Sequence, residues 1–310
     1  MNDKEIISKD VVIIGGGIAG LTSVLYLGRM NIDSILFESD LLGGQIVNSD
    51  SIENYPGIEN ISGSKLIENL LNQIKNYSSV KIEEFDKILS VNLLGKELES
   101  ESYIYKFKSV IIASGMKRRR LYIENEDTYL NRGIHFCEQC DGFKYKDKSV
   151  GVIGGGNSAF QSALYLSNFC KEVYLISRSE FRADKVLQDK IRKIPNIIKP
   201  LTNQLLFKLV GDRHKLTGVQ LISRDLEVFF LQIEGLFVNI GNEPNSNLFK
   251  GQLDLDDSGF IESNDCTTKI QGVFVAGDVR IKKVRQLVTA SSDGCICANL
   301  VKNYLDEINK

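Results

Sequence analysis

Two cysteines separated by two residues, Cys137 and Cys140, have the clearest capacity for chemistry in this 310-residue chain. Such a pair can close a small disulfide ring that exchanges with another disulfide. Half of a structural zinc site is one alternative, but such a site needs a second pair of ligands. The other close cysteines, Cys295 and Cys297, have one residue between them, and the chain has only two histidines. We therefore predict a redox pair and no metal, with incidental buried thiols as the remaining alternative.

Asp141 directly follows the second cysteine and is the candidate proton donor. Dithiol chemistry moves protons as well as electrons, so a carboxyl group at this position can donate or relay one. Its alternative role is that of a turn residue before Gly142. A freed thiolate of the pair would attack a substrate disulfide and form a mixed disulfide. We therefore predict Cys137, Cys140 and Asp141 as the catalytic residues.

The chain contains one glycine-rich unit twice. Residues 11–39 and 150–178 align without a gap, and each contains an apolar strand, three successive glycines, an apolar helix and a second apolar strand. This is the βαβ unit of dinucleotide-binding domains, in which a pyrophosphate lies against the helix N-terminus. One such turn is a weak signal, because many are ordinary turns before helices. Two in the same context indicate two nucleotide sites.

Each position of these turns has a physical role. The first glycine allows the tight turn, the second lets the backbone approach a pyrophosphate, and the third position must be small so that helix and strand can pack. In the first copy the predicted binding residues are Gly15, Gly17 and Gly20. In the second copy they are Gly154, Gly156, Asn157, Ser158 and Ala159.

The two copies differ at the end of the second strand, where a ribose would be recognised. The first copy has Glu38 there, and a carboxylate suits the ribose hydroxyls of FAD or NAD. The second copy has Ser177 followed by Arg178, with Arg182 nearby, and such donors suit the 2′-phosphate of NADPH. The charge of Glu180 opposes a phosphate at this place. The second copy is therefore predicted to bind NADPH through Arg178 and Arg182.

A segment near the C-terminus favours a flavin in the first copy. An apolar strand over residues 272–276 ends in Gly277 and Asp278. A carboxylate at the end of such a strand suits the hydroxyls of a ribityl chain, and the alternative is a plain strand followed by a turn. We therefore predict FAD as the cofactor of the first copy.

Composition limits the partners. The 38 basic and 40 acidic residues leave a net charge of −2, which provides no broad field for nucleic acid or an anionic membrane. The sequence has no signal-peptide pattern and no apolar stretch of roughly 18 residues. We therefore expect a cytoplasmic protein with neither nucleic acid nor membrane as a partner.

Taken together, these segments resemble the low-molecular-weight thioredoxin reductases along nearly the whole chain. The matching segments are 15–20, 43–45, 53–57, 137–142, 154–159, 277–278 and 285–286. The resemblance implies an α/β fold with two Rossmann-like dinucleotide-binding domains of the three-layer ββα type, the second inserted in the first. Residues 1–116 and 247–310 would form the FAD-binding domain, and residues 117–246 the pyridine-nucleotide-type domain that carries the cysteine pair. It also implies a homodimer.

The resemblance further implies roles for single residues. Cys140 would face the flavin, Cys137 would attack thioredoxin, and Asp141 would be the acid. Rotation of one domain against the other would bring the pair to flavin and substrate in turn. The implied FAD contacts are Gly44, Gln45, Asn54, Gly277, Asp278, Arg285 and Gln286.

The chain departs from the family in two places. Glu138 and Gln139 stand between the cysteines, where the family usually has small residues. Segment 177–182 keeps two arginines of the family's 2′-phosphate signature but lacks its histidine and its middle arginine. An NADPH-dependent thioredoxin reductase is therefore the first hypothesis, and a reductase of the same build that takes electrons from ferredoxin is the alternative.

Three further hypotheses have less support from the sequence. The cysteine pair argues against a ferredoxin–NADP reductase of the same shape. The reductase of a peroxide-reducing system would have an additional thioredoxin-like domain before the FAD strand. A nucleotide-sensing module without activity would not reduce a disulfide.

Overall fold

The structure is a computed structural model, and it describes residues 4–47, 49, 52–194, 197–212 and 214–310. The chain divides into two compact units, unit 1 with Met1–Lys117 and Glu243–Lys310, and unit 2 with Arg118–Asn242. The sequence-based domain boundaries, after residues 116 and 246, lie near these limits. Residues 1–3 of the predicted FAD-binding domain lie outside the described residues.

The sheet of unit 1 is centred on β1 (Ile6–Ile14), which runs parallel to β2 (Ser34–Glu38) on one side and to β6 (Ile104–Ile112) on the other. β3 (Val80–Glu84) continues the sheet beyond β2, also parallel. β1 begins earlier than the apolar run predicts, because its polar first half still pairs along β6 from Ile6 onward. The predicted strand–turn–helix–strand unit is therefore present with its second strand alongside the first.

The far edge of β6 pairs with two different strands. Its first part runs antiparallel to β5 (Glu97–Ser100), which forms a hairpin with β4 (Ile88–Asn92). Its last part runs parallel to β17 (Val273–Val275), the core of the predicted C-terminal strand. The segment that ends in Gly277 and Asp278 therefore joins the same sheet as the first glycine-rich turn.

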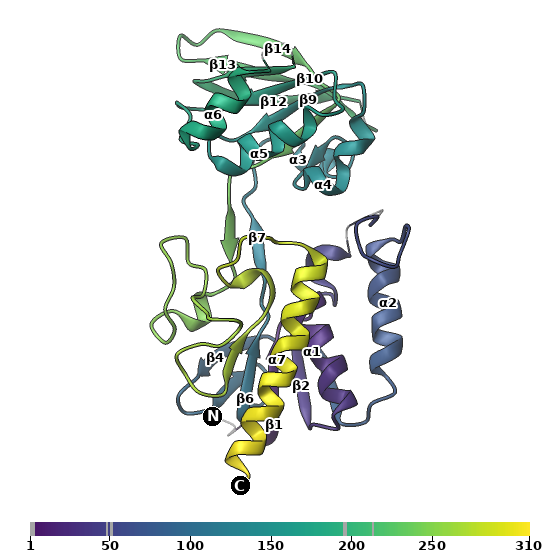
Figure 1. Cartoon of the computed structure of the whole chain (residues 1–310), viewed down its shortest axis with the longest axis vertical. Helices are drawn as coiled ribbons and strands as arrows, with labels where there is room; N and C mark the ends of the chain where they lie inside the picture. The colour runs from purple at the N-terminus through teal and green to yellow at the C-terminus, as the bar shows by residue number, and fades with distance from the viewer. Residues whose placement is uncertain (1–3, 48, 50–51, 195–196, 213) are drawn as a thin grey trace. The chain divides into compact units, whose positions relative to one another are not determined.

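Helices cover one face of this sheet. α1 (Ile18–Arg29) and α7 (Leu287–Ile308) run side by side, with α2 (Gly63–Ile74) beyond α1 (Figure 1). A Cβ added at Gly294 of α7 would lie 2.3 Å from the backbone oxygen of Ala19, so the two helices approach backbone to backbone. Buried apolar residues of these helices and of β1 and β2 form one core cluster, and a second cluster on the opposite face includes Tyr105, Phe249 and Ile261.

Unit 2 contains a parallel five-stranded sheet in the order β11 (Ile198–Leu201), β10 (Glu172–Ile176), β9 (Ser149–Ile153), β15 (Gly235–Val238) and β8 (Ile134–His135). The strands are short and almost continuously apolar, as is usual for a parallel sheet buried on both faces. The second predicted βαβ unit corresponds to β9, α5 (Asn157–Leu166) and β10.

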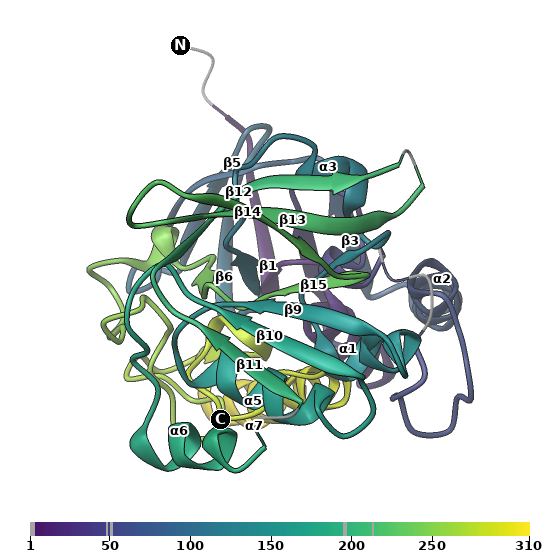
Figure 2. The same cartoon turned by 90° about the horizontal axis from the view of Figure 1, so that it is seen from above.

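The two faces of that sheet are covered differently. Figure 2 shows α5 and α6 (Lys185–Arg192) on one side, and on the other an antiparallel sheet of β12 (Gln204–Gly211), β13 (Leu216–Ser223) and β14 (Val228–Gln232). Phe160, Ala163 and Leu166 fill the helical layer, and Val219 and Leu221 fill the layer between the sheets. The unit is therefore a three-layer ββα structure, and the predicted α/β fold class is confirmed.

The remaining elements are short. β7 (Met116–Arg118) and β16 (Asn242–Pro244), the two segments where the chain passes between the units, pair with each other. Unit 2 also contains α3 (Glu126–Tyr129), α4 (Glu138–Asp141) and η2 (Gly142–Tyr145), and unit 1 contains η1 (Gly44–Ile46), η3 (Asn247–Phe249) and η4 (Gly277–Val279). Within the described residues, no helix combines the length and apolar character needed to cross a bilayer.

Candidate active site

Cys137 and Cys140 are joined by a disulfide in unit 2. Cys137 is the N-cap of the one-turn helix α4, and its Sγ accepts a hydrogen bond from the Cys140 backbone N–H at 3.2 Å. Cys140 is exposed and Cys137 is half-buried. Phe143, three residues further on, is 70% exposed. The disulfide is therefore at the surface of unit 2, three residues before a large exposed apolar side chain.

Asp141 follows the disulfide in the same helix and contacts two cationic or potentially cationic side chains. Its Oδ1 accepts a hydrogen bond from Lys144 Nζ at 2.8 Å, and its Oδ2 lies 3.2 Å from Nδ1 of His135. The second contact is an ion-pair distance without the alignment of a hydrogen bond. Burial would raise the pKa of Asp141, but His135 and Lys144 outweigh burial and bring it to about 2. The predicted acid is therefore an ionised carboxylate in this state.

His135 is buried on β8, and sequence reasoning did not identify it. Its Nε2 lies 2.7 Å from the hydroxyl of Tyr145, and its ring packs against the rings of Tyr145 and Phe237. Burial, then the charges of Asp141 and Glu234, raise the pKa of Tyr145, so the phenol stays protonated. A histidine two residues before the first cysteine was the only sequence signal that could have pointed to this group.

The first glycine-rich turn in unit 1 is shaped for close backbone approach. A Cβ added at Gly20 would lie 1.9 Å from the Gly15 oxygen, and one at Gly15 would lie 2.4 Å from the Ala113 oxygen. Gly17, in contrast, has nothing within 4 Å of such a Cβ. Gly17 also caps α1 without a side-chain hydrogen bond, and the first turn of the helix holds no acidic residue. This combination suits an anionic group such as a pyrophosphate.

Other residues predicted for this site come from two segments, the end of β2 and η1. Gly44 lies next to Gly17, since its Cβ would lie 3.6 Å from the Gly17 Cα. Glu38 at the end of β2 accepts a hydrogen bond from Gly16 N–H at 2.8 Å. Gln45 donates to the backbone oxygen of Met116 at 2.5 Å. The carboxylate predicted for a ribose is therefore adjacent to the glycine turn.

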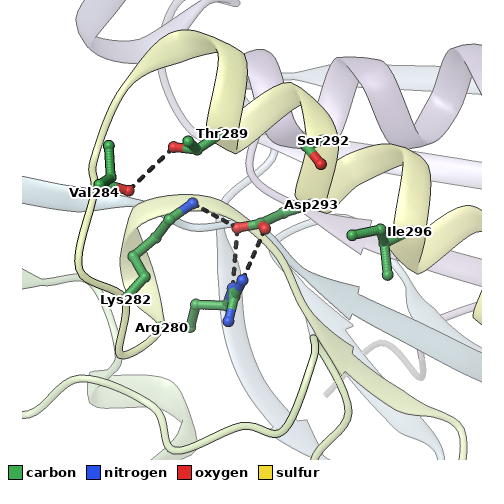
Figure 3. Close-up of a pocket in the computed structure, with 7 residues that line it drawn as sticks. All are labelled: Arg280, Lys282, Val284, Thr289, Ser292, Asp293 and Ile296. Atoms are coloured by element: carbon green, nitrogen blue, oxygen red, sulfur yellow. Dashed lines mark hydrogen bonds and ion pairs between the residues drawn. The ribbon is translucent and has the colours of Figure 1, made fainter.

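Gly277 and Asp278 lie in η4, at the end of β17, and a buried ion cluster holds this segment. Asp293 of α7 accepts a hydrogen bond from Gly277 N–H at 2.9 Å, and it pairs with Arg280 and Lys282 at 2.8 and 2.7 Å. These three side chains line an open pocket of about 310 Å³. Figure 3 shows the contacts between them. Both cations that line the pocket are paired with Asp293, so the cluster anchors the chain rather than offering charge to a ligand.

Asn54, Gln286 and Arg285 have different environments. Asn54 Nδ2 donates to Gln286 Oε1 at 3.2 Å, and Gln286 is the N-cap of α7 in a capping box with Thr289. The Arg285 guanidinium lies 4.2 Å from the centre of the Phe260 ring and donates to the carbonyl oxygens of its own loop. The structure therefore brings Asn54 and Gln286 together, whereas the Arg285 side chain bonds to carbonyl oxygens of its own loop.

The second glycine-rich turn repeats the geometry of the first. A Cβ added at Gly154 would lie 2.2 Å from the Asn239 oxygen and 2.9 Å from the Cβ of the fully buried Ala159. Gly156 has nothing within 4 Å of its added Cβ, and it caps α5 without a side-chain hydrogen bond. Asn157 and Ser158 follow in the first turn, which has no acidic residue. This turn also suits a pyrophosphate.

The segment that would recognise the ribose of the second copy is mixed in charge. Arg178 and Arg182 are exposed, and Ser177 is buried with its Oγ against Gly155. Glu180 accepts a hydrogen bond from Asn203 at 2.7 Å. Asp184, which sequence reasoning missed, accepts one from Asn157 at 2.9 Å. Two carboxylates therefore alternate along the segment with the arginines predicted to bind the 2′-phosphate.

The four remaining cysteines are free thiols. Cys170, Cys266 and Cys297 are buried, and Cys295 is half-buried. Burial raises the pKa of Cys170 to about 12, which makes it a poor nucleophile. Among the described residues, no group of three or more histidine, cysteine or acidic side chains is placed to hold a metal ion.

The model of the pyridine nucleotide-disulphide oxidoreductase family matches residues 9–294 of the chain. A protein of Clostridium pasteurianum described as a 34.2 kDa protein in the rubredoxin operon is 37% identical over 306 residues, which is 97% of this chain and 99% of the relative. A thioredoxin reductase of Peptoclostridium acidaminophilum is 37% identical over 308 residues, 96% of this chain and 97% of the relative.

The crystal structure of a thioredoxin reductase from Streptococcus pyogenes matches with a TM-score of 0.90 and 33% identity, covering 97% of this chain and 99% of that one. The resemblance stated from the motifs is thereby confirmed. The chain belongs to the pyridine nucleotide-disulphide oxidoreductase family and, within it, to the low-molecular-weight thioredoxin reductases.

Proposed function

We propose that the protein is an FAD-dependent thioredoxin-disulfide reductase in which the Cys137–Cys140 disulfide receives electrons and passes them to thioredoxin. The observation that carries this proposal is the disulfide in the surface helix α4, in a chain with two dinucleotide-type turns. The exposed Phe143 beside it suits a protein substrate, because exposed aromatic side chains are common anchors in protein interfaces. Thioredoxin is the substrate that the names of relatives suggest.

In the proposed FAD site, the residues of unit 1 bind and orient. The backbone at Gly15, Gly17 and Gly20 would hold the pyrophosphate at the start of α1, and Glu38 would accept hydrogen bonds from the adenosine ribose. FAD, when bound and reduced by the donor, would supply the electron pair that opens the disulfide. The other proposed contacts are Gly44, Gln45, Asn54, Gly277, Asp278 and Gln286, with Arg285 as a contact only if its loop opens.

Disulfide exchange follows from the cysteine pair itself. In the dithiol form, the Cys140 N–H that bonds Cys137 Sγ would stabilise a thiolate on Cys137. That thiolate would attack the thioredoxin disulfide, a Cys137–thioredoxin bond would form, and one thioredoxin sulfur would leave with a proton. Cys140 would then attack Cys137, which closes the disulfide again and releases thioredoxin as the dithiol.

NADPH is the proposed electron donor, with its pyrophosphate on the turn Gly154–Ala159. Arg178 and Arg182 would pair with the 2′-phosphate, against the opposing charge of Glu180 and Asp184. NADPH would supply a hydride to the flavin. Ferredoxin is the alternative donor, and the two carboxylates near the arginines are the observation that favours it. We also propose a homodimer, on the strength of the family resemblance alone.

One experiment separates these possibilities. Purified protein should be yellow with bound FAD and should reduce the disulfide of thioredoxin when a donor is supplied. Anaerobic stopped-flow bleaching of the flavin by NADPH, NADH and reduced ferredoxin in turn identifies the donor. Fast bleaching by NADPH supports the proposal. Bleaching by ferredoxin alone would identify ferredoxin as the electron donor in place of NADPH. A flavin-free protein, or one that leaves thioredoxin oxidised with every donor, would contradict the function.

A further inference from the structure

The contacts of His135 join the cysteine helix to the interior of unit 2. The imidazole is 1% exposed, with Asp141 of α4 on its Nδ1 side and Tyr145 of η2 on its Nε2 side. Phe237 of β15 packs against its ring. Asp141 in turn pairs with Lys144. The imidazole therefore has a carboxylate at ion-pair distance from Nδ1, where it can stabilise the charged form, and a hydroxyl at hydrogen-bond distance from Nε2.

Tyr145 is the partner that can bond to the imidazole in either protonation state. Its hydroxyl can donate to Nε2 when the imidazole is neutral, and it can accept from Nε2–H when the imidazole is charged. Burial raises the pKa of Tyr145, so the phenol does not compete for the proton by ionising. Two further charged groups act on this side: Lys148 Nζ lies 5.7 Å from the centre of the Tyr145 ring, and Glu234 adds negative charge near its hydroxyl.

The reaction of the cysteine pair requires a proton carrier. Conversion of the Cys137–Cys140 disulfide to a dithiol takes two electrons and two protons, and its closure on a substrate disulfide gives the same number back. Under the proposed function, the electron pair comes from reduced flavin. At least one proton must then reach a thiolate from the protein and return to the protein before Cys137 attacks.

Asp141 alone is poorly suited to hold this proton at neutral pH. His135 and Lys144 stabilise its ionised form and bring its pKa to about 2. Histidine is the side chain that commonly takes up and releases a proton in the physiological pH range. The carboxylate is therefore better placed to transfer the proton than to store it.

We propose that His135 holds the proton for the cysteine pair and exchanges it with the thiolates through the carboxylate of Asp141. Opening of the disulfide creates negative charge on sulfur, the proton passes from Nδ1 to Asp141 and from there to the nearer thiolate, and His135 becomes neutral. When Cys137 loses its proton for attack, the same path returns it to the imidazole, and the two thioredoxin sulfurs that leave take one proton from Cys140 and one from solvent. His135 thus acts on the cysteines through Asp141, as a positioning residue. This role rests on the proposed redox function of the cysteine pair.

The histidine content of the chain permits a direct test on the flavin-loaded protein. Only two histidines are present, and the other, His214, is exposed in the loop after β12. Nuclear magnetic resonance of protein labelled at the imidazole carbon therefore gives two signals, assigned with His214→Asn. We expect the His135 signal to titrate with pH and its midpoint to shift by about half a pH unit or more when a phosphine reductant opens the disulfide.

His214 is the internal control and should titrate with the same midpoint in both redox states. A His135 signal that does not move between about pH 5 and 9, or whose midpoint is the same in both states, would overturn the proposal. This readout requires neither thioredoxin nor an electron donor. If the unmodified protein fails to reduce thioredoxin, the proposed function is wrong. If the His135 signal does not change, the proton role of His135 is wrong.

Kinetics of variants provide the second test. His135→Gln should lower the rate of thioredoxin reduction about tenfold or more and should remove the inflection of the pH–rate profile near neutrality. A uniform loss of rate with an unchanged pH profile would indicate a merely structural role and contradict the proposal. If His135→Gln folds poorly, Tyr145→Phe provides the test instead. Loss of its hydroxyl leaves a buried N–H without a partner in the charged imidazole, so the His135 midpoint should fall, and an unchanged midpoint would contradict the scheme.

Discussion

Asn157 and Asp184 are held together by two hydrogen bonds at the first turn of α5. The side-chain Nδ2 of Asn157 donates to Oδ2 of Asp184 at 2.9 Å, and the Asp184 N–H donates to Oδ1 of Asn157 at 2.8 Å. The pair brings a carboxylate to the helix end that otherwise favours anions. The second glycine-rich turn therefore combines a backbone shaped for a pyrophosphate with a side chain that repels one.

This relationship predicts that Asp184→Asn tightens NADPH binding. The amide can still accept the hydrogen bond from Asn157, so the turn keeps its geometry and loses only the charge. Removal of one exposed like charge should strengthen binding by about two- to fivefold. The measurement is an anaerobic NADPH titration of the flavin-loaded protein. Arg182→Gln is the matched variant and should weaken binding; equal affinity in all three proteins would show that NADPH does not use this segment.

The cysteine pair provides the second prediction. Cys140→Ser should abolish thioredoxin reduction and leave the amount of bound flavin unchanged, because the pair and the first glycine-rich turn belong to different units. The assay is thioredoxin reduction alongside the ratio of flavin to protein. Cys170→Ala, which removes a buried thiol outside the proposed chemistry, should keep the activity. Continued reduction by the Cys140→Ser protein would exclude the pair as the electron relay.

The features that could be read from the sequence are local. The spacing Gly15, Gly17, Gly20 fixes a turn that has no room for a Cβ at its first and third positions. In the second turn Gly154 likewise has no room for a Cβ, and the third position is the small, fully buried Ala159. Apolar strands on both sides of each turn then determine a parallel sheet. These signals lie within about thirty residues of each other, so one pass along the chain detects them.

The features that the sequence did not reveal depend on contacts between elements. His135 meets Asp141 and Tyr145 only because β8 is placed beside α4 and η2. Asp184 reaches Asn157 across the loop before α6. Motif matching likewise does not show that the Arg285 side chain is used within its own loop. Side-chain partners of this kind follow from packing, which no spacing rule encodes.

The first glycine-rich turn also predicts a contrast between two of its glycines, Gly17 and Gly20. Gly20→Ala should destabilise the protein by about 1–3 kcal/mol, because the new methyl group meets the Gly15 oxygen at 1.9 Å. Gly17→Ala should fold normally, since nothing lies within 4 Å, but the methyl group would occupy the proposed pyrophosphate position. Its affinity for FAD should fall, measured by adding FAD to the apoprotein. Unchanged affinity in Gly17→Ala would argue against the assignment of this turn.

The ion cluster around Asp293 predicts that loss of this carboxylate lowers the stability of unit 1. Asp293 is 4% exposed and neutralises Arg280 and Lys282, so Asp293→Ala would leave two largely buried cations without this partner. Loss of one partner of a buried ion cluster costs about 3–5 kcal/mol. Urea unfolding followed by circular dichroism measures this loss. Ser292→Ala, at the exposed position just before Asp293 in α7, should change little, and equal stability of the two variants would show that the cluster does not anchor η4.

The lowered pKa of Asp141 predicts how stability depends on pH. Burial opposes ionisation, but His135 and Lys144 favour it more strongly, so the pKa falls from 3.8 in the unfolded chain to about 2 in the folded one. A carboxylate with a depressed folded pKa stabilises the protein above its unfolded pKa, and this stabilisation is lost as the pH falls toward the folded pKa. The full contribution is about 2 kcal/mol, present above about pH 5 and absent near pH 2.

Asp141→Asn isolates this contribution from those of the other carboxylates. The difference in unfolding free energy between the unchanged protein and the variant should shrink steadily as the pH falls below about 4, because protonated Asp141 resembles the amide. Denaturant titrations at a series of pH values measure the difference. If it persisted undiminished to about pH 2, the ionised carboxylate would not be the form stabilised by His135 and Lys144. The role of Asp141 as a charged relay beside the disulfide would then have to be abandoned.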